Sequence, residues 1–438
     1  MSDVLEDYSP VQIGTTGVFG GRGFTVIGRI QLRYTAGMWN EWYALFDDGT
    51  AAWLGDSSGL FTLTTERKSE QALPAFEDIV PAQSYPIAGH DYTAAEVRIA
   101  DCIGGQGELP FRVGQGWQAR VADFRFGTSF LTLDYSDGDL PALYTGQAVT
   151  LAELKCQLLR DDETINTAAG KYRGKIDRLD CRSCGSNIDY LPGLTANVIC
   201  PSCHAQLEIA GPKVQVLATA SRMAKLNTTL ELGAKATING VPHQIIGLMK
   251  RSDDENTVWT EYLLYSARAG FLWLIETDEG WARAKVQNEW PRWSHGETAT
   301  IGNTVFKKLY DYSAKVIFAA GAFNWRVKVG DVVQVSEFEK GQNKLAAEMT
   351  TDDITWSQSS PVPADQIRAW FGEQINADKA GGDDDTKSLS HKFIIGILAI
   401  NAIPLLMNFG GSFFIVLLAI AAIYYPAKLM GPVGKGEE

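Results

Sequence analysis

A long internal duplication constrains the fold of this chain more than any other feature. The segment "MWNEWYALFDDGTAAWL", with Trp39 and Glu41, matches "VWTEYLLYSARAGFLWL", with Trp259 and Glu261. A second pair of segments, "PFRVGQGWQARVADF" and "NWRVKVGDVVQVSEF", aligns without a gap. The offsets of the two matches are similar, 220 and 214 residues, so both belong to one repeated unit. The predicted modules span residues 10–160 and 225–375.

Each module has the composition of short antiparallel strands. Trp, Tyr, Thr and Val are interrupted by Gly about every eight to twelve residues, and an Asp-Asp-Gly turn lies between two apolar runs of the first repeat. Each copy ends in a helix-like segment, with a Thr150–Glu153 capping box in the first and Ile367 and Trp370 on one face in the second. The predicted fold class is mainly β: two half-barrel-like antiparallel modules, each with a terminal helix.

Four cysteines between the modules form two CxxC pairs separated by fifteen residues. They are Cys181, Cys184, Cys200 and Cys203. Each CxxC turn brings two thiolates together, and a hairpin between the turns completes a tetrahedral set. Because four thiolates leave no position for water, the pattern predicts a structural zinc ribbon over residues 161–215.

The C-terminal end differs from the rest of the chain. Residues 376–392 are polar and rich in Gly and Asp, which is typical of a linker. Residues 393–426 contain an apolar run without a charge up to Tyr425. About twenty such residues cross a bilayer, so we expect this run to insert as one helix or as a re-entrant hairpin.

Two residue types recur in register between the modules and are candidates for a pair. Glu41 and Glu261 each follow a Trp by two residues, and Arg112 and Arg326 align in the second repeated segment. A strand places alternate side chains on one face, so each Glu is expected beside Trp39 or Trp259 at the edge of an aromatic core. A buried carboxylate needs a partner, and we expect the recurring arginines to supply it.

Composition limits the other possibilities. The net charge of −13 argues against non-specific nucleic-acid binding by the whole chain. The first residues lack a secretory signal, and CxxC pairs are typical of a reducing compartment, so we expect the folded part to face the cytoplasm. Basic residues do gather around the first CxxC pair, but interspersed Asp favours a solvated surface there. They are Lys171, Arg173, Lys175, Arg178 and Arg182.

The repeated W-x-E-[WY] and FRV/WRV segments, the four-Cys ribbon and the apolar tail together resemble the bacterial domain-of-unknown-function family 4178. The resemblance covers most of residues 10–375. Members of that family look like neighbours, in bacterial gene clusters, of polyamine-synthesis enzymes, small membrane proteins and membrane-stress scaffold proteins. The resemblance therefore implies a role in an envelope-associated assembly, and it supplies no catalytic residues.

These observations lead us to expect an adaptor anchored in the inner membrane through 393–426. It would bind other proteins of a membrane-associated complex through its duplicated modules, with a homo-oligomer also possible. Two other classes stay open. The chain would be an enzyme or enzyme subunit acting on a small cationic metabolite such as a polyamine if Glu41 or Glu261 lined a pocket with Trp neighbours. It would bind nucleic acid through the ribbon if the basic residues formed a continuous face.

Overall fold

The computed structural model describes most of both modules and part of the ribbon. The described residues are 9–34, 37–57, 60–69, 71–160, 177–181, 183–190, 197–203, 205–210, 213–218, 228–266, 269–323, 325–375 and 377.

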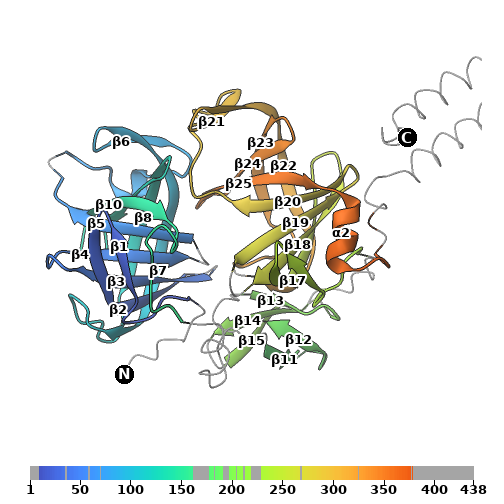
Figure 1. Ribbon diagram of the computed structural model, residues 1–438, viewed down its shortest axis with the longest axis horizontal. Coiled ribbons are helices and arrows are strands. Elements are labelled where there is room, and N and C mark those ends of the chain that lie inside the picture. The colour runs from blue at the N-terminus through green and yellow to red at the C-terminus, as the bar shows by residue number, and fades with distance from the viewer. Residues whose placement is uncertain are drawn as a thin grey trace, which may run out of the picture. The chain divides into compact units, whose positions relative to one another are not determined.

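The first module is a closed antiparallel barrel of eight strands, blue to green in Figure 1. Two four-stranded meanders form it, and the barrel closes where β2 pairs with β7. In order around the barrel the strands are β2 (Arg22–Tyr34), β3 (Gly37–Phe46), β4 (Ala51–Ser57), β5 (Leu60–Arg67), β10 (Ala142–Val149), β9 (Ser129–Asp134), β8 (Gln118–Phe126) and β7 (His90–Gly107). Two short strands, β1 (Thr16–Phe19) and β6 (Ser84–Ile87), extend the sheet at β2 and β7, and a 3-10 turn, η1, spans Phe76–Asp78.

The second module repeats this architecture, yellow to orange in Figure 1, and closes where β17 pairs with β22. Its strands, in the same order, are β17 (Val241–Ser252), β18 (Val258–Ser266), β19 (Gly270–Thr277), β20 (Gly280–Val286), β25 (Ile354–Val362), β24 (Asn343–Met349), β23 (Val332–Lys340) and β22 (Thr304–Phe323). The short strands β16 (Lys235–Ile238) and β21 (Thr298–Ile301) correspond to β1 and β6, and helix α2 (Ala364–Phe371) follows β25. The duplication in the sequence is thus a duplication of a whole barrel.

The outward face of the first barrel carries its main apolar core. Trp42, Phe46 and Leu54 are almost completely buried there, and they pack against Val11 and Leu154 from segments outside the barrel strands. Because side chains alternate along a strand, the residues between them face the barrel interior. The interior face carries Glu41, Asp123 and Asp134 as well as aromatic rings, so it is the more polar of the two.

Glycines make the closure of each barrel possible. Gly28 pairs with Gly107 at the seam of the first barrel, and Gly247 pairs with Gly321 at the seam of the second. Gly107 and Gly321 have positive φ angles of 75° and 90°. A Cβ on either would lie 2.3 Å from a backbone carbonyl of the facing strand. Only glycine permits this approach, so the same steric requirement appears in both copies.

Two details of the predicted fold are wrong. The modules are closed barrels, not half-barrels, because strands distant in sequence pair at the seam. Among the described residues α2 is the one α-helix, and the first module ends in a single turn instead. The Thr150–Glu153 capping box does form, with Glu153 N–H to Thr150 Oγ1 at 3.2 Å and Thr150 N–H to Glu153 Oε2 at 2.8 Å. The turn stops because Lys155 takes a left-handed φ of 46°.

The ribbon is joined to the second barrel. Its strands are β11 (Asp177–Asp180), β12 (Asn187–Tyr190), β13 (Asn197–Ile199), β14 (Gln206–Ala210) and β15 (Lys213–Ala218). Strand β13 pairs with the end of β22, with Ile199 opposite Gly321, so β13, β14 and β15 continue the sheet of that barrel. The predicted insert between the modules is therefore part of the second one structurally.

The predicted linker 376–392 and the apolar segment 393–426 lie, apart from Ala377, outside the described residues. Among the residues that are described, no helix has the length and apolar character to cross a membrane.

Candidate metal centre and barrel interiors

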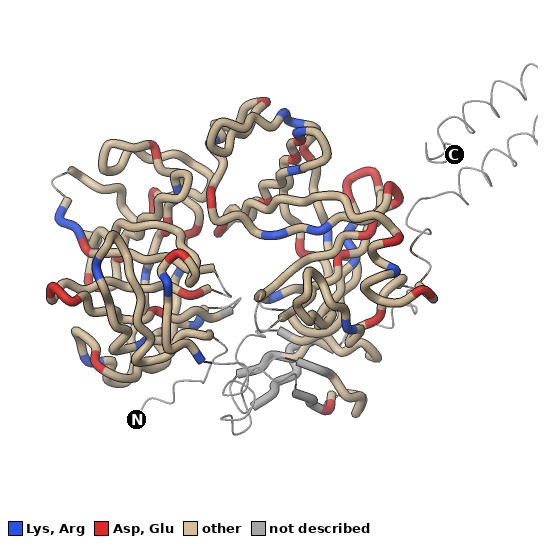
Figure 2. The backbone as a smooth tube through the Cα atoms, in the orientation of Figure 1, with Lys and Arg blue, Asp and Glu red and all other residues tan. Residues whose placement is uncertain are grey.

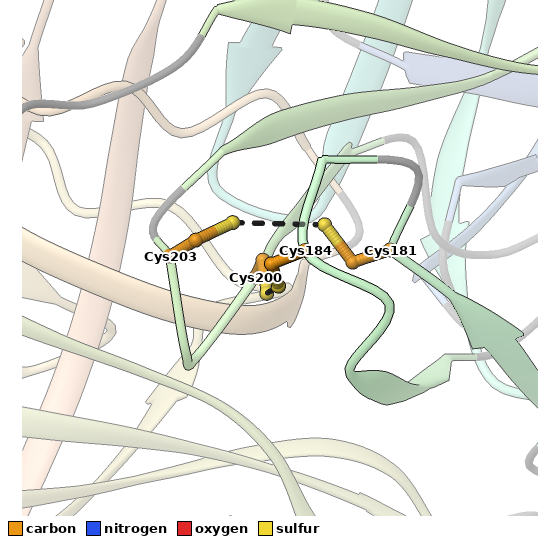
Figure 3. Close-up of side chains that lie close together, drawn as sticks. All are labelled: Cys181, Cys184, Cys200 and Cys203. Atoms are coloured by element: carbon orange, nitrogen blue, oxygen red, sulfur yellow. Dashed lines mark hydrogen bonds between the residues drawn. The ribbon is translucent and has the colours of Figure 1, made fainter.

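The four cysteines lie on two tight turns that hold their side chains toward one point (Figure 3). In the first turn the Gly185 N–H donates to the Cys181 carbonyl at 2.7 Å, and Gly185 has a positive φ of 77°. In the second turn the Cys200 N–H donates to the Ala205 carbonyl at 2.9 Å. These turns are the local reason for the CxxC spacing, since each brings two thiols to the same side.

The distances between the sulfur atoms fit a tetrahedral metal site. Cys181 Sγ lies 3.6 Å from Cys203 Sγ, and Cys184 Sγ lies 3.6 Å from Cys200 Sγ. All four sulfurs lie within 4.8 Å of one another. Metal–sulfur bonds of about 2.3 Å give a tetrahedron with edges of about 3.8 Å. A disulfide would require about 2.05 Å, so this arrangement suits four thiolates around one ion.

The four thiols differ in their burial and in their hydrogen bonds. Cys181 and Cys200 are buried, Cys203 is half-buried and Cys184 is exposed. Burial raises the pKa of Cys200 to about 12, whereas hydrogen bonds from Ser186 lower the pKa of Cys184 to about 6. The four thiols therefore differ in how readily they lose the protons that metal binding displaces.

The buried cysteines belong to the core of the second barrel. Cys181 and Cys200 pack in one cluster with Val198 and Leu207 of the ribbon. The same cluster contains barrel residues, including Met249, Leu263, Ala319 and Phe323. Order at the metal site and packing of the second barrel are thus physically connected.

In each barrel the repeated Trp and Glu form the same hydrogen bond. Trp39 Nε1–H donates to Glu41 Oε1 at 2.9 Å, and Trp259 Nε1–H donates to Glu261 Oε1 at 2.7 Å. The expectation that each Glu lies on the same face as the Trp before it is confirmed. Both indoles are only half-buried. Within the W-x-E-[WY] segments the fully buried aromatic rings are those of Trp42 and Tyr262, on the outward face.

The predicted arginine partners are not partners of these carboxylates. Arg112 and Arg326 are both exposed. Glu261 instead lies 3.5 Å from Arg251 Nη1, which also lies 2.9 Å from Glu348 Oε2. Arg251 stands opposite Trp259 in the pairing of β17 with β18. Strand alternation places Arg251 on the same face as Met249, which stands opposite Glu261. This alternation was the signal in the sequence for Arg251, because the residue does not recur between the copies.

The first barrel places Glu41 among other acids. Burial, and secondly the charge of Asp123, raise the pKa of Glu41 to about 8. Burial also raises the pKa values of Asp123 and Asp134. Asp123 has Arg125 and Arg98 nearby, and both lower its pKa against that effect. Acidic and basic residues are interspersed along both barrels (Figure 2), so the excess of acids is a local property of this interior.

The structure does not test whether the basic residues around the first CxxC pair form a continuous face. Lys171, Arg173, Lys175 and Arg182 lie outside the described residues, and for Arg178 only the backbone is described.

Fold and site together define a class: a tandem protein of closed antiparallel barrels with a cluster of four cysteines between them in sequence that could hold a metal ion. The chain belongs to the family described as "Domain of unknown function (DUF4178)", whose model matches residues 12–151 and 231–364, one match for each barrel. Comparisons with curated proteins and with solved structures find no match.

Proposed function

We propose that the four thiolates hold Zn²⁺ and that this ion stabilises the ribbon without taking part in chemistry. Four sulfurs at tetrahedral distances complete the coordination shell of Zn²⁺, which leaves no open position for water or substrate. The short ribbon strands bury too little surface to fold unaided, so a metal cross-link supplies what the core cannot.

We propose further that the whole chain is an adaptor of the inner membrane, with its barrels on the cytoplasmic side. This proposal rests on a difference between the two copies of the barrel. Both copies keep the same closed framework and the same Trp–Glu hydrogen bond, but the ribbon sheet is added to the second copy through β13 and β22. Two related modules with different surfaces suit an adaptor that joins two partners. The apolar segment 393–426 supplies the anchor.

The partners proposed are other proteins of an envelope-associated complex, of the membrane-stress or polyamine-linked kind that the family resemblance implies. Lipid would be contacted through 393–426, and the chain could also form a homo-oligomer.

Separate unfolding of each barrel tests the adaptor role. Trp42 and Trp356 are each 1% exposed in the apolar cores of the first and second barrels. Replacing either by Ala costs about 3–5 kcal/mol and should unfold its own module first. The full chain is extracted from membranes in mild detergent, and the proteins bound to it are identified after cross-linking.

We expect Trp42→Ala to remove one partner and Trp356→Ala to remove a different one, while the unaltered chain recovers both. A tagged protein carrying residues 376–438 alone is the matched control for capture by the membrane segment. Recovery of the same proteins by this control and by the full chain would contradict the proposal. A chain ending at Ile375 should leave the membrane fraction with its barrels folded; continued membrane association would show that another surface holds the bilayer.

The second candidate is an enzyme or enzyme subunit that acts on a small cationic metabolite. One observation favours the binding of such a cation: Glu41 lies in the barrel interior beside Trp39 and near Asp123 and Asp134. Incubation of the purified chain with candidate amines and analysis of the products by mass spectrometry would separate turnover from binding.

A further inference from the structure

The interiors of the two barrels can be compared position by position, because the strand registers are equivalent. Glu41 and Glu261 follow the repeated Trp in β3 and β18. Asp134 and Glu348 stand opposite the repeated valines Val121 and Val335, which align in the second duplicated segment. Each barrel therefore places two carboxylates at the same two interior positions.

The second barrel neutralises its two carboxylates with a cation of its own. The Arg251 guanidinium reaches Glu348 Oε2 at 2.9 Å and Glu261 Oε1 at 3.5 Å. The Arg251 side chain is 8% exposed and that of Glu261 is 11% exposed, so the group sits well inside the barrel. A carboxylate pair that holds a planar cation is one of the stronger polar arrangements available to a protein interior.

The first barrel has the carboxylates without this cation. Leu32 stands opposite Trp39 as Arg251 stands opposite Trp259, so an apolar side chain occupies the place of the arginine. Among the described residues, none forms an ion pair with Glu41. Two arginines of this barrel interact with Asp123 instead of Glu41: Arg98, which also pairs with Glu96 and lies over the Tyr34 ring, and Arg125, which lies over the Phe130 ring.

The interior side chains near Glu41 are less buried than the apolar core. Glu41, Asp123, Thr132, Asp134 and Tyr144 are each partly exposed. By contrast, the outward-facing core residues Trp42, Ala122 and Leu133 are almost completely buried.

Aromatic rings complete the lining near Glu41. Tyr43 and Trp53 lie on the same face as Glu41 and contact each other at 4.9 Å between ring centroids. Such rings also favour cations over neutral molecules.

We propose that the interior of the first barrel binds a small organic cation, whose guanidinium or ammonium group lies between Glu41 and Asp134 as Arg251 lies between Glu261 and Glu348. In the second barrel the equivalent site is then already occupied by a cation of the protein itself, the Arg251 guanidinium. This inference is independent of the adaptor role, because a barrel that binds a cation can still present its outer surface to a protein.

The indole N–H of Trp39 reports on the site directly, since it donates to Glu41. The experiment uses the full chain in detergent with ¹⁵N-labelled Trp and follows the indole signals during titration with ethylguanidinium chloride. Trp259, whose Glu261 is already paired, is the internal control. N-ethylurea, a neutral molecule of similar shape, and NaCl at matched ionic strength are the ligand controls.

We expect a saturable shift of the Trp39 signal, with a Kd between about 1 and 50 mM for a cation of this size. The Trp259 signal should not move, and N-ethylurea should shift neither. Glu41→Gln should abolish the response of Trp39. Leu32→Arg should do the same by supplying an internal cation.

The converse variant Arg251→Leu should give Trp259 a response of the same kind. A Trp39 signal that stays unmoved up to about 50 mM ethylguanidinium, or that moves equally with N-ethylurea, would overturn the proposal. If Leu32→Arg does not fold, Glu41→Gln alone decides: an undiminished response in that variant would also overturn it.

Discussion

Leu32 and Arg251 occupy the same place in the two barrels, each directly opposite the Trp that donates to the interior Glu. This one difference changes the electrostatics of the two interiors. Glu261 has a guanidinium at 3.5 Å, whereas the charges that shift the pKa of Glu41 are those of other carboxylates. The duplicated framework has thus been kept while the charge inside it has diverged.

Reversing the charge of Glu261 should destabilise the second barrel. Glu261→Lys places two cations together in the interior, and the loss of a buried pair costs about 3–5 kcal/mol. Adding Arg251→Glu restores an attractive pair and should recover part of this loss. The measurement is the free energy of unfolding of the second barrel in urea.

Arg326→Glu is the matched control for that experiment. Arg326 is exposed, so its reversal should change stability by less than about 0.5 kcal/mol and should not rescue Glu261→Lys. Rescue by Arg326→Glu instead of Arg251→Glu would show that the interior pairing is assigned to the wrong arginine.

The first barrel should lose stability as the pH rises. Burial and the charge of Asp123 raise the pKa of Glu41 from 4.5 to about 8 in the folded barrel. A raised pKa means that the folded state holds the proton more tightly than the unfolded state. The stability from this proton is fully present below about pH 4.5 and is lost as the pH rises through about 8.

Thermal unfolding of the chain and of Glu41→Gln, followed through Trp fluorescence across this pH range, measures the effect. The melting temperature of the first barrel should fall with pH, and Glu41→Gln should flatten the decline. An equally steep decline in Glu41→Gln would assign the effect to Asp123 and Asp134, whose pKa values are also raised.

Closure of the barrels should depend on glycine at the seam. In Gly107→Ala the new Cβ would meet the Ile27 carbonyl at 2.3 Å, and the φ of 75° adds backbone strain. We expect a loss of more than about 3 kcal/mol in unfolding free energy, since backbone atoms of both strands must move.

Gly89→Ala separates the backbone strain from the steric clash of the new Cβ. Gly89 has a similar φ of 81°, but a Cβ there meets nothing within 4 Å. This control should cost only the left-handed strain, about 1–2 kcal/mol. Equal losses in the two variants would mean that the seam tolerates a side chain and that closure does not require glycine.

The sequence alone was enough to predict the duplication, the β class, the Trp–Glu neighbours and the four-cysteine set. These features depend on local patterns: strand alternation places Glu41 beside Trp39, and CxxC turns bring thiols together. Barrel closure could not be predicted in the same way, because it depends on contact between Gly28 and Gly107 on strands far apart in the chain. The repeat pointed to Arg112 and Arg326 because they recur. The actual partner, Arg251, does not recur, since its counterpart is Leu32.

The prediction of a terminal helix in the first module was wrong for a different reason. The capping box at Thr150 and Glu153 is genuine, but it begins a single turn. After Lys155 the chain returns to the sheet, where Gln157 bonds to Thr16. A start signal for a helix does not determine its length when tertiary pairing competes for the backbone.

X-ray absorption at the metal edge of the purified full chain tests most directly whether the four cysteines between the duplicated barrels form a closed structural metal centre. We expect close to one Zn²⁺ per chain, bound by four sulfur atoms at about 2.3 Å with no oxygen or nitrogen ligand. Cys200→Ser should lose the ion and make the second barrel susceptible to protease before the first, because Cys200 packs in the core of that barrel. A coordination shell with an open or water-occupied position would contradict the structural role, and a metal-free chain that resists protease would contradict the metal centre itself.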